Sequence, residues 1–301
     1  MKIVLAGGTG FIGKHLREFL IKEGHEIVIL TRKSSQASKN IQYVQWVHHD
    51  TLPEQEIKSA DVFVNLAGTS LNEGRWNERQ KKQIYESRIN ATRALRRIIE
   101  QLPKKPAVLI NASAIGIYPT SIDAIYTENS SEIAPDFLGK TVKDWEDEAK
   151  TVEQLGIRTV FMRFGVVLGK NAGALPLMVL PYQMFVGGRI SHGKQWVSWI
   201  HIEDVVRAIH FAIMNSDIQG PVNVTAPHPV QMETFGKTIA AVIRRPHWFP
   251  VPSLLLQLLL GDKSKLILEG QHVQPKVLIE NGFTFKFPTL TSALKDLLKS
   301  R

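Results

Sequence analysis

The first sixteen residues, MKIVLAGGTGFIGKHL, constrain the fold of this chain more than any other stretch. A short apolar run leads directly into Gly7, Gly10 and Gly13, and the sequence that follows is amphipathic. Between a strand and a helix, glycines at this spacing allow a tight turn, close approach of backbone to a pyrophosphate, and helix–strand packing. The triplet alone is a weak signal, but here it begins a βαβ unit of the right length. We therefore predict a dinucleotide-binding loop rather than an ordinary glycine-rich turn.

Short β-rich runs alternate with helical patterns through the first 165 residues. Strands are predicted at residues 2–7, 26–32, 62–68, 107–113 and 158–165. Helical stretches lie between them, notably at residues 13–24 and 78–102, where apolar residues recur on one face. Strands that alternate with helices predict parallel βαβ units, and strands that are apolar throughout predict a sheet covered on both faces. The predicted fold class is therefore α/β, with a doubly wound parallel sheet of the Rossmann type.

Beyond residue 165 the regular alternation of strands and helices ends, and segments rich in Gly and Pro follow. Such segments are typical of loops around the carboxyl edge of such a sheet. We predict one Rossmann domain over residues 1–240, with substrate-side loops from about residue 166. Residues 248–301 carry an apolar pattern of their own, which predicts a small, mostly helical C-terminal domain that caps the first.

The composition excludes several classes of site. There is no cysteine, which rules out disulfides, thiolate nucleophiles and cysteine metal sites. The ten histidines show no metal-ligand spacing, so no metal is predicted. The formal net charge of +9 comes from scattered basic pairs without interleaved aromatic residues, which favours a solvated surface over a nucleic-acid partner.

Neither a leader nor a membrane span is predicted. Only four apolar residues precede the glycines, and the longest later apolar run, at residues 254–260, is far shorter than the roughly 18 residues of a spanning helix. We therefore expect a cytoplasmic protein without a membrane partner. The sequence leaves its oligomeric state open.

One long segment is free of acidic residues. No Asp or Glu occurs from residue 154 to residue 202, although five cations fall inside this segment: Arg158, Arg163, Lys170, Arg189 and Lys194. This asymmetry leads us to expect that the segment faces an anionic ligand.

The end of the second predicted strand indicates which cofactor the loop prefers. NAD binders usually place an acidic residue there, where it holds the ribose 2′-hydroxyl. This chain has Thr31, Arg32 and Lys33 instead. A hydroxyl and a guanidinium suit a 2′-phosphate, so the predicted cofactor is NADP(H); an ordinary surface arginine is the alternative.

The motifs GGTGFIG, VNLAG, RFGVVLG and SWIHIEDV occur in this order. With them the chain resembles the extended short-chain dehydrogenase/reductases, the group of sugar-nucleotide epimerases and dehydratases. It is most similar to an atypical, epimerase-like subfamily that ends in a small C-terminal domain. The matching positions are 65–68, 75–76, 87–88, Thr92, 163–169 and 199–204, and the resemblance covers nearly the whole chain.

The resemblance implies that several segments hold the cofactor. The residues that it implies are Gly7, Thr9, Gly10, Phe11, Ile12 and Gly13 of the glycine loop, Thr31 and Arg32 at the adenosine phosphate, Leu66, Ala67 and Gly68 along the adenine and ribose, Gln83 and Arg88 from the following helix, and Val166 near the nicotinamide. For Arg88, an ordinary helix-surface charge is the alternative.

The catalytic machinery departs from that group. Its enzymes use a Tyr and a Lys four residues later, whose ammonium lowers the phenol pKa so that the phenolate can exchange a proton with a substrate hydroxyl. None of the five tyrosines here is followed by Lys at that distance. Near the tyrosine slot stand Phe137 and Leu138, and the usual active Ser or Thr is replaced by Ala114, with Ser113 one residue earlier.

Substitute catalytic residues are conceivable. Tyr118 would serve as the phenol, Lys140 or Lys143 as the cation, and Ser113 as the nearby hydroxyl. A packing role explains Tyr118 equally well.

Other polar residues leave similar alternatives. His201 and Asp204 resemble an acid–base pair, but their spacing opens a helix, which favours a structural role as cap and brace. Trp196 and Trp199 suit either a wall of a substrate pocket or core packing.

Two functions follow. The first is an NADP-dependent oxidoreductase or epimerase that acts on a small, anionic substrate such as a nucleotide sugar; the acid-free segment favours it. The second is a non-catalytic NADPH-binding module that senses redox state or regulates a partner; the missing Tyr–Lys pair favours it. The glycine loop and Arg32 serve both equally.

Overall fold

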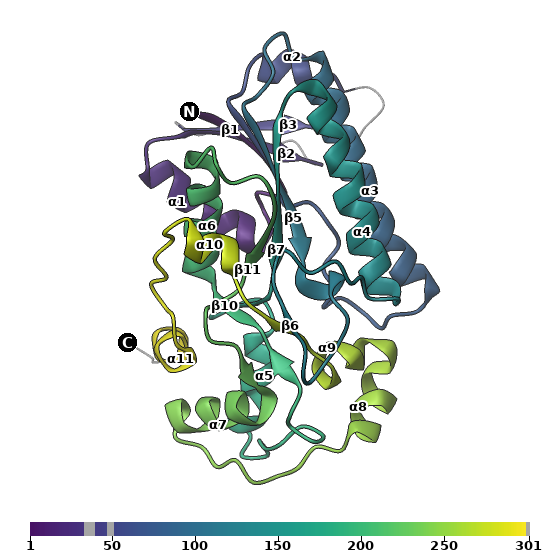
Figure 1. The fold of residues 1–301 in the computed structure, drawn as a ribbon, viewed down its shortest axis with the longest axis vertical. Helices are drawn as coiled ribbons and strands as arrows, with labels where there is room; N and C mark the ends of the chain where they lie inside the picture. The colour runs from purple at the N-terminus through teal and green to yellow at the C-terminus, as the bar shows by residue number, and fades with distance from the viewer. Residues whose placement is uncertain (33–39, 47–50, 299–301) are drawn as a thin grey trace.

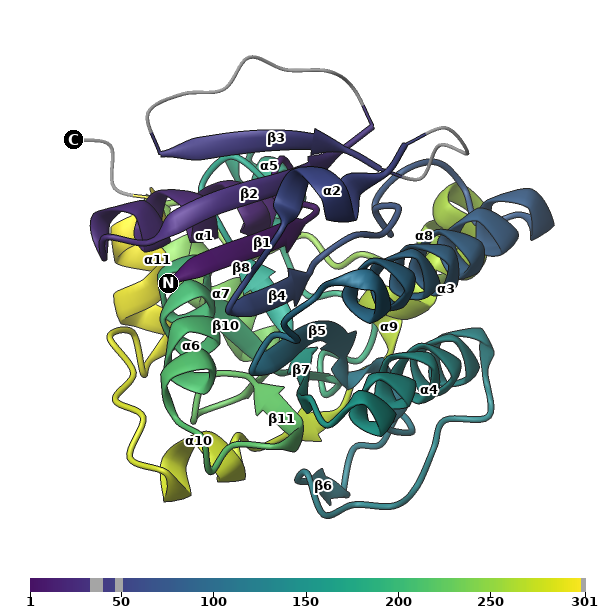
Figure 2. The ribbon, with the colours of Figure 1, turned by 90° about the horizontal axis from the view of Figure 1, so that it is seen from above.

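A computed structural model describes residues 1–32, 40–46 and 51–298 of the chain. Its centre is a seven-stranded sheet in the order β11-β7-β5-β4-β1-β2-β3, and every neighbouring pair is parallel (Figure 2). The strands are β1 (Lys2–Ala6), β2 (Glu26–Thr31), β3 (Ile41–Gln45), β4 (Val62–Asn65), β5 (Val108–Ala114), β7 (Arg158–Phe164) and β11 (Gly220–Val224). The strand order reverses between β1 and β4, and this reversal is the topological switch point of the sheet.

Helices cover both faces of the sheet, α1 (Phe11–Lys22) and α6 (Ile202–Met214) on one, and α2 (Pro53–Ile57), α3 (Glu78–Gln101) and α4 (Phe137–Lys150) on the other (Figure 1). Alternate residues of a strand therefore enter different cores: Ile3 and Leu5 of β1 join one cluster, whereas Val4 joins the other. The prediction of a doubly wound parallel sheet is confirmed.

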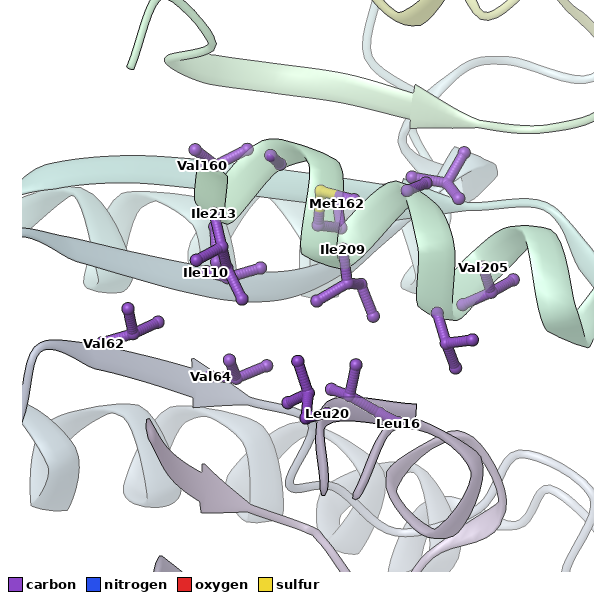
Figure 3. Packing of buried hydrophobic residues seen from close by; sticks show 14 of the residues in the cluster. Leu16, Leu20, Val62, Val64, Ile110, Val160, Met162, Val205, Ile209 and Ile213 are labelled. Atoms are coloured by element: carbon purple, nitrogen blue, oxygen red, sulfur yellow. The ribbon is translucent and has the colours of Figure 1, made fainter. Parts of the chain in front are cut away.

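The core between α1 and α6 shows why these segments are helical. Leu16 and Leu20 lie one turn apart on α1 and are both fully buried. They meet Val64 of β4 and Ile209 of α6 in one apolar layer (Figure 3). On the opposite face, the side chains of Asn77 and Asp136 cap the N-termini of α3 and α4.

Two edge strands, β3 and β11, were not predicted. β11 begins with Gly220 and Pro221, residues that disfavour strands in general but are tolerated at a sheet edge. β3 lies at the opposite edge of the sheet, and Val44 is its single buried residue.

Most of the remaining elements gather beyond the carboxyl ends of the central strands, toward the lower end of Figure 1. Short strands pair as β8 (Val166–Leu168) with β10 (Trp199–His201), β9 (Trp196–Val197) with β12 (Val230–Gln231), and β6 (Ile125–Tyr126) with β13 (His272–Val273). The helices here are η1 (Ile115–Ile117), α5 (Leu175–Gln183), α7 (Met232–Ile243), α8 (Ser253–Leu260), η3 (Gly261–Ser264), α9 (Lys265–Leu268) and α11 (Leu290–Leu298). Elsewhere, η2 (Thr151–Leu155) joins α4 to the amino end of β7, and α10 (Lys276–Glu280) packs beside β11.

The C-terminal part is mostly helical, as predicted, and α11 shares a buried apolar cluster with α7 through Leu294 and Phe235. The division of the chain near residue 248 stays a prediction. Within the described ranges, no helix has the length and apolar character needed to cross a membrane.

Candidate functional site

Two loops meet at the switch point, one after β1 and one after β4. The amide of Leu66 donates to the carbonyl of Ala6 over 2.9 Å. Gly7 has φ +78°, and a Cβ there would lie 2.6 Å from the carbonyl carbon of Leu66. Only glycine therefore permits this turn and this contact. In open parallel sheets, the crevice outside the carboxyl ends at such a reversal is where ligands bind.

The other two glycines of the loop have different surroundings. A Cβ on Gly13 would lie 2.2 Å from the carbonyl oxygen of Gly7, so the helix can pack on the loop only through glycine. A Cβ on Gly10 would approach that same oxygen at 3.3 Å and would meet nothing else within 4 Å. Gly7 and Gly13 thus serve the packing of the chain itself, whereas Gly10 keeps space open on the outer side of the loop.

The N-terminus of α1 opens into this space. Gly10 occupies the N-cap position, so no side chain caps the helix, and its first turn contains no acidic residue. The first amides of the helix, from Phe11 and Ile12, have no acceptor within the helix, and they carry the positive end of its dipole. Thr9 is exposed beside them. This arrangement suits a pyrophosphate.

Phe11 connects the loop to the RFGVVLG segment. A Cβ on Gly169 would lie 2.4 Å from Cζ of the Phe11 ring, and one on Gly173 would lie 3.1 Å from its Cε1. The ring therefore fills the space above both glycines. Val166, at the start of β8 in the same segment, is half-buried. The sequence motif was recognised as a family signature, but this contact was not predicted from it.

The end of β2 carries the two residues assigned to the adenosine phosphate. Thr31 is the last residue of the strand and is half-buried, and Arg32 follows it at the surface. Lys33 lies outside the described residues.

Arg88 lies on α3, directly behind the loop that follows β4. Its guanidinium donates to the carbonyls of Thr69 (3.2 Å) and Ile84 (2.8 Å) and lies 5.2 Å from the centre of the Trp145 ring. A Cβ on Gly68 would come within 3.3 Å of its Cζ. Burial lowers the pKa of Arg88 to about 10.

No carboxylate of the described residues pairs with Arg88. A half-buried cation without a counterion favours an anion nearby, and the contacts of Arg88 with two carbonyls and the Trp145 ring argue against a simple surface charge. Leu66 and Ala67 are half-buried beside it, while Gly68, and Gln83 on the same helix, are exposed.

A second polar region lies at the ends of β5 and β7, where Ser113 and Arg163 stand opposite each other in the sheet. Arg163 donates from Nε and Nη2 to the two carboxylate oxygens of Glu146, each over 2.8 Å. Ser113 donates to the same carboxylate over 2.5 Å. Burial alone lowers the pKa of Arg163, but the hydrogen bonds and charge of Glu146 raise it overall. Glu146, on α4, thus binds both residues.

Tyr118 completes this region, which we call the buried network (Ser113, Tyr118, Glu146 and Arg163). Its hydroxyl accepts from Nη1 of Arg163 over 2.8 Å and shares its proton between the carbonyl of Thr127 (3.0 Å) and Oδ1 of Asn223 (2.9 Å). The residue is fully buried, and burial raises the pKa of its phenol despite the neighbouring arginine.

A catalytic phenol would need a lowered pKa and access to a substrate, so this geometry favours a packing role for Tyr118. The cations considered as its partners lie elsewhere. Lys140 pairs with Asp144, and Lys143 with Asp147, on the outer face of α4. The cation beside the phenol is Arg163, which the sequence did not indicate as its partner.

His201 and Asp204 have the structural roles that the helix-opening pattern favoured. Nδ1 of His201 accepts from the amide of Glu203 over 3.1 Å and so caps α6. Asp204 is fully buried and accepts from the amides of Lys286 and Phe287, each over 2.8 Å. It therefore ties the C-terminal part to α6.

The expectation that the acid-free segment faces an anionic ligand is wrong for two of its five cations. Arg163 belongs to the buried network. Arg158 donates to the carbonyls of Ala212 (3.0 Å) and Ile218 (2.6 Å), where it caps the C-terminal end of α6. Charge alone did not distinguish these structural arginines from exposed ones.

The two tryptophans of this segment both pack against other parts of the chain, Trp199 in the core and Trp196 at a half-buried position. Trp199 is fully buried and donates to the carbonyl of His228 over 3.2 Å. Trp196 donates to the carbonyl of Ile122 over 2.7 Å, and its ring centre lies 4.2 Å from that of His272.

Comparison with known proteins agrees with this architecture. The model of the NAD dependent epimerase/dehydratase family matches residues 3–225, and a domain of unknown function matches residues 251–297. Epimerase family protein YfhF of Bacillus subtilis is 50% identical over 302 residues, which span 100% of this chain and 99% of that protein.

Two solved structures are similar over nearly the whole chain. The human epimerase family protein SDR39U1, solved with NADPH, has 31% identity and a TM-score of 0.88, with 99% of each chain covered. The nucleoside-diphosphate sugar epimerase from Corynebacterium glutamicum has 29% identity and a TM-score of 0.79, covering 99% of this chain and 58% of that one. The resemblance seen in the motifs is confirmed, and the chain belongs to the NAD dependent epimerase/dehydratase family.

Proposed function

We propose that this chain binds NADP(H) at the switch point between β1 and β4. The observation that carries the proposal is the glycine loop, where Gly7 and Gly13 satisfy internal packing and Gly10 leaves space beside an uncapped helix N-terminus. The human relative solved with NADPH supports it.

The residues present fit the cofactor. The glycine loop with Thr9, Phe11 and Ile12 would hold the pyrophosphate, and Thr31 with Arg32 the 2′-phosphate. Leu66, Ala67 and Gly68 would line the adenine and ribose, with Gln83 and Arg88 behind them and Val166 near the nicotinamide. Bound NADPH would supply a hydride, and the two hydroxyls of the buried network, on Ser113 and Tyr118, are shielded from solvent.

Two functions remain for a chain with this cofactor. The first is oxidoreductase or epimerase chemistry on a small, anionic, nucleotide-sugar-like substrate. The family supports it, and so do Lys170, Arg189 and Lys194, which stay exposed in the acid-free segment. The second is a non-catalytic NADPH-binding module. The burial of Ser113 and Tyr118 supports this second function more directly.

The cofactor proposal is tested by calorimetry with NADPH and NADH. A guanidinium meets a 2′-phosphate with charge-assisted hydrogen bonds worth about 1.5–3 kcal/mol, so NADPH should bind roughly 10- to 100-fold more tightly. Arg32→Ala should bring the two affinities together, chiefly by weakening NADPH, and added salt should shrink the preference. Arg97→Ala, at an exposed position on α3, serves as the control.

Equal affinities of the parent for the two cofactors would overturn the assignment of Arg32, and so would a preference that Arg32→Ala leaves untouched. Measuring the turnover of candidate substrates would distinguish the catalytic function from the non-catalytic one. We expect no epimerisation of common nucleotide sugars, since the acid–base pair is absent from the sequence.

A further inference from the structure

Exposed apolar side chains concentrate in two segments outside the site just described. We call residues 177–186 and 244–260 together the leucine–arginine face. Its exposed apolar residues are Leu177, Leu180, Met184, Phe185, Val186, Trp248, Phe249, Leu254, Leu255, Leu258 and Leu259. Helix α8, with the sequence SLLLQLLL, lies within it and has no buried residue at all. In the sequence, this apolar run is too short to span a membrane.

The two segments form one continuous face. Nε1 of Trp248 donates to the carbonyl of Phe185 over 2.8 Å. The amide of Phe249 donates to the carbonyl of Gly187 over 3.2 Å. The guanidinium of Arg245 lies 4.4 Å from the centre of the Phe185 ring. Helix α8 begins at Ser253, four residues after Phe249, and both the chain that leads into it and α8 itself lie at the lower end of the molecule (Figure 1).

These side chains protrude instead of lining a hollow. Trp248 is 70% exposed, Leu258 68% and Leu254 65%. A pocket for a small molecule surrounds its ligand, so the residues that line it are largely covered by one another. Exposure at this level fits an extended partner that the face lies against.

The charges of the face indicate what that partner is. Residues 177–186 and 244–260 contain no Asp or Glu, whereas Arg244 and Arg245 are both exposed at its border. If two copies of this chain paired through this face, their arginines would lie near one another, and the face would offer no acidic residue to pair with them. Anionic headgroups complement it, and a combination of Trp, Phe and Leu with Arg is typical of surfaces that enter the bilayer interface.

We propose that the leucine–arginine face docks on the surface of an anionic lipid bilayer. The leucines of α8 and the ring of Trp248 enter the boundary between headgroups and acyl chains, and Arg244 and Arg245 contact the headgroups. This docking is peripheral and requires no segment that crosses the bilayer. The proposal departs from the expectation of no membrane partner, which rested on the length of apolar runs.

Helix α8 also contacts the segment between β4 and α3, since Arg75 donates to the carbonyl of Leu258 over 3.0 Å. In η3, which follows α8, Asp262 pairs with Lys81 of α3 over 2.7 Å. These contacts join the proposed docking surface to the part of the chain that follows β4.

The experiment is co-sedimentation of the full chain with vesicles of phosphatidylcholine alone or mixed with phosphatidylglycerol. The parent should pellet with the mixed vesicles, weakly with phosphatidylcholine, and less as salt is added. Arg244→Gln with Arg245→Gln should weaken binding to mixed vesicles about 30-fold, at roughly 1 kcal/mol per cation. Leu254→Gln with Leu258→Gln should weaken binding to both vesicle types at least about tenfold.

The leucine variants should fold, because α8 buries no residue, and urea unfolding checks this. Ile279→Gln is the matched control: Ile279 is 52% exposed on α10, outside the face, and its replacement should not change binding. Failure of the parent to pellet with mixed vesicles would overturn the proposal. So would variants that bind like the parent, or a parent dimer in sedimentation equilibrium that the leucine variants dissociate.

Discussion

The glycine loop and the buried network both lie at the carboxyl edge of the same sheet, yet they differ in what they leave available. At the loop, the N-terminus of α1 is uncapped, and Gly10 leaves the space outside it open. In the network, the polar groups of Ser113, Glu146 and Arg163 are bonded to one another and shielded from solvent.

The difference indicates that the proposed binding of NADP(H) and proton transfer would depend on different parts of the fold. The proposed binding depends on backbone shape and small residues, which the glycine loop provides. In the enzymes that the motifs resemble, proton transfer depends on particular side chains, whose positions fall near the end of β5 and the start of α4 here. In that place the chain has Ala114, with Leu138 packed beside Gly116.

The largest expected effect comes from opening the network. Glu146→Ala leaves Arg163 as a buried cation without its carboxylate, which should cost about 3–5 kcal/mol of the free energy of unfolding. Asp147→Ala, which removes an exposed partner of Lys143 on the same helix, should cost less than about 1 kcal/mol. Urea unfolding measures both. Equal stability of the two variants would mean that the network does not hold this region together.

Next come two alanine substitutions in the glycine loop. Gly13→Ala places a Cβ 2.2 Å from the carbonyl oxygen of Gly7, and the overpacking should cost about 1–3 kcal/mol. Gly10→Ala should leave stability nearly unchanged but weaken NADPH at least about tenfold, because its methyl occupies the space that a pyrophosphate needs. Calorimetry and urea unfolding separate the two effects. A Gly10→Ala variant with parental NADPH affinity would refute the pyrophosphate assignment.

Tyr118→Phe probes the network more gently. It leaves Nη1 of Arg163 and Oδ1 of Asn223 without the hydroxyl, a loss that should cost about 1.5 kcal/mol of the free energy of unfolding. Any turnover should persist. If the substitution abolished turnover but left stability unchanged, the phenol of Tyr118 would have a catalytic role.

The smallest effect is a pH dependence at Glu128, beneath the network. Its Oε1 accepts from the amide of Asn223 over 2.9 Å, and Oε2 is buried without a hydrogen-bond partner in the described residues. Burial raises the pKa of this carboxyl despite the amide bonds. The folded state thus favours the neutral acid.

Stability from this group is therefore present below the ordinary glutamate pKa of 4.5 and declines as pH rises through the raised folded value. The slope is at most about 1.4 kcal/mol per pH unit. Glu128→Gln should remove the decline, whereas Glu132→Gln, at an exposed position, should keep it. Unfolding midpoints across that pH range decide between these outcomes.

The sequence predicted the inner strands, the helices around them and the glycine loop, because local periodicity and glycine spacing determine these features. It missed β3 and β11, whose edge positions relax the apolar pattern. It also missed the partner of Arg163. Helix α4 carries several acids, and charge does not tell which of them faces inward.

The helical periodicity of α4 indicates which of these acids faces inward, although not which residue it binds. Val142, Trp145 and Ala149 are buried at intervals of three and four, and Glu146 falls on the same stripe. The bond between Ser113 and Glu146 joins a strand to a separate helix, and only the sheet register brings Arg163 opposite Ser113. Periodicity along one element does not contain that information.

The packing of the Phe11 ring against Gly169 and Gly173 has a consequence for how relatives of this chain diverge. The ring at position 11 fills the space that a side chain at position 169 would need, so neither residue can become larger while the other stays the same. A lineage that acquires a side chain at position 169 must first lose the ring at position 11, and the two sites should therefore be inherited as a pair.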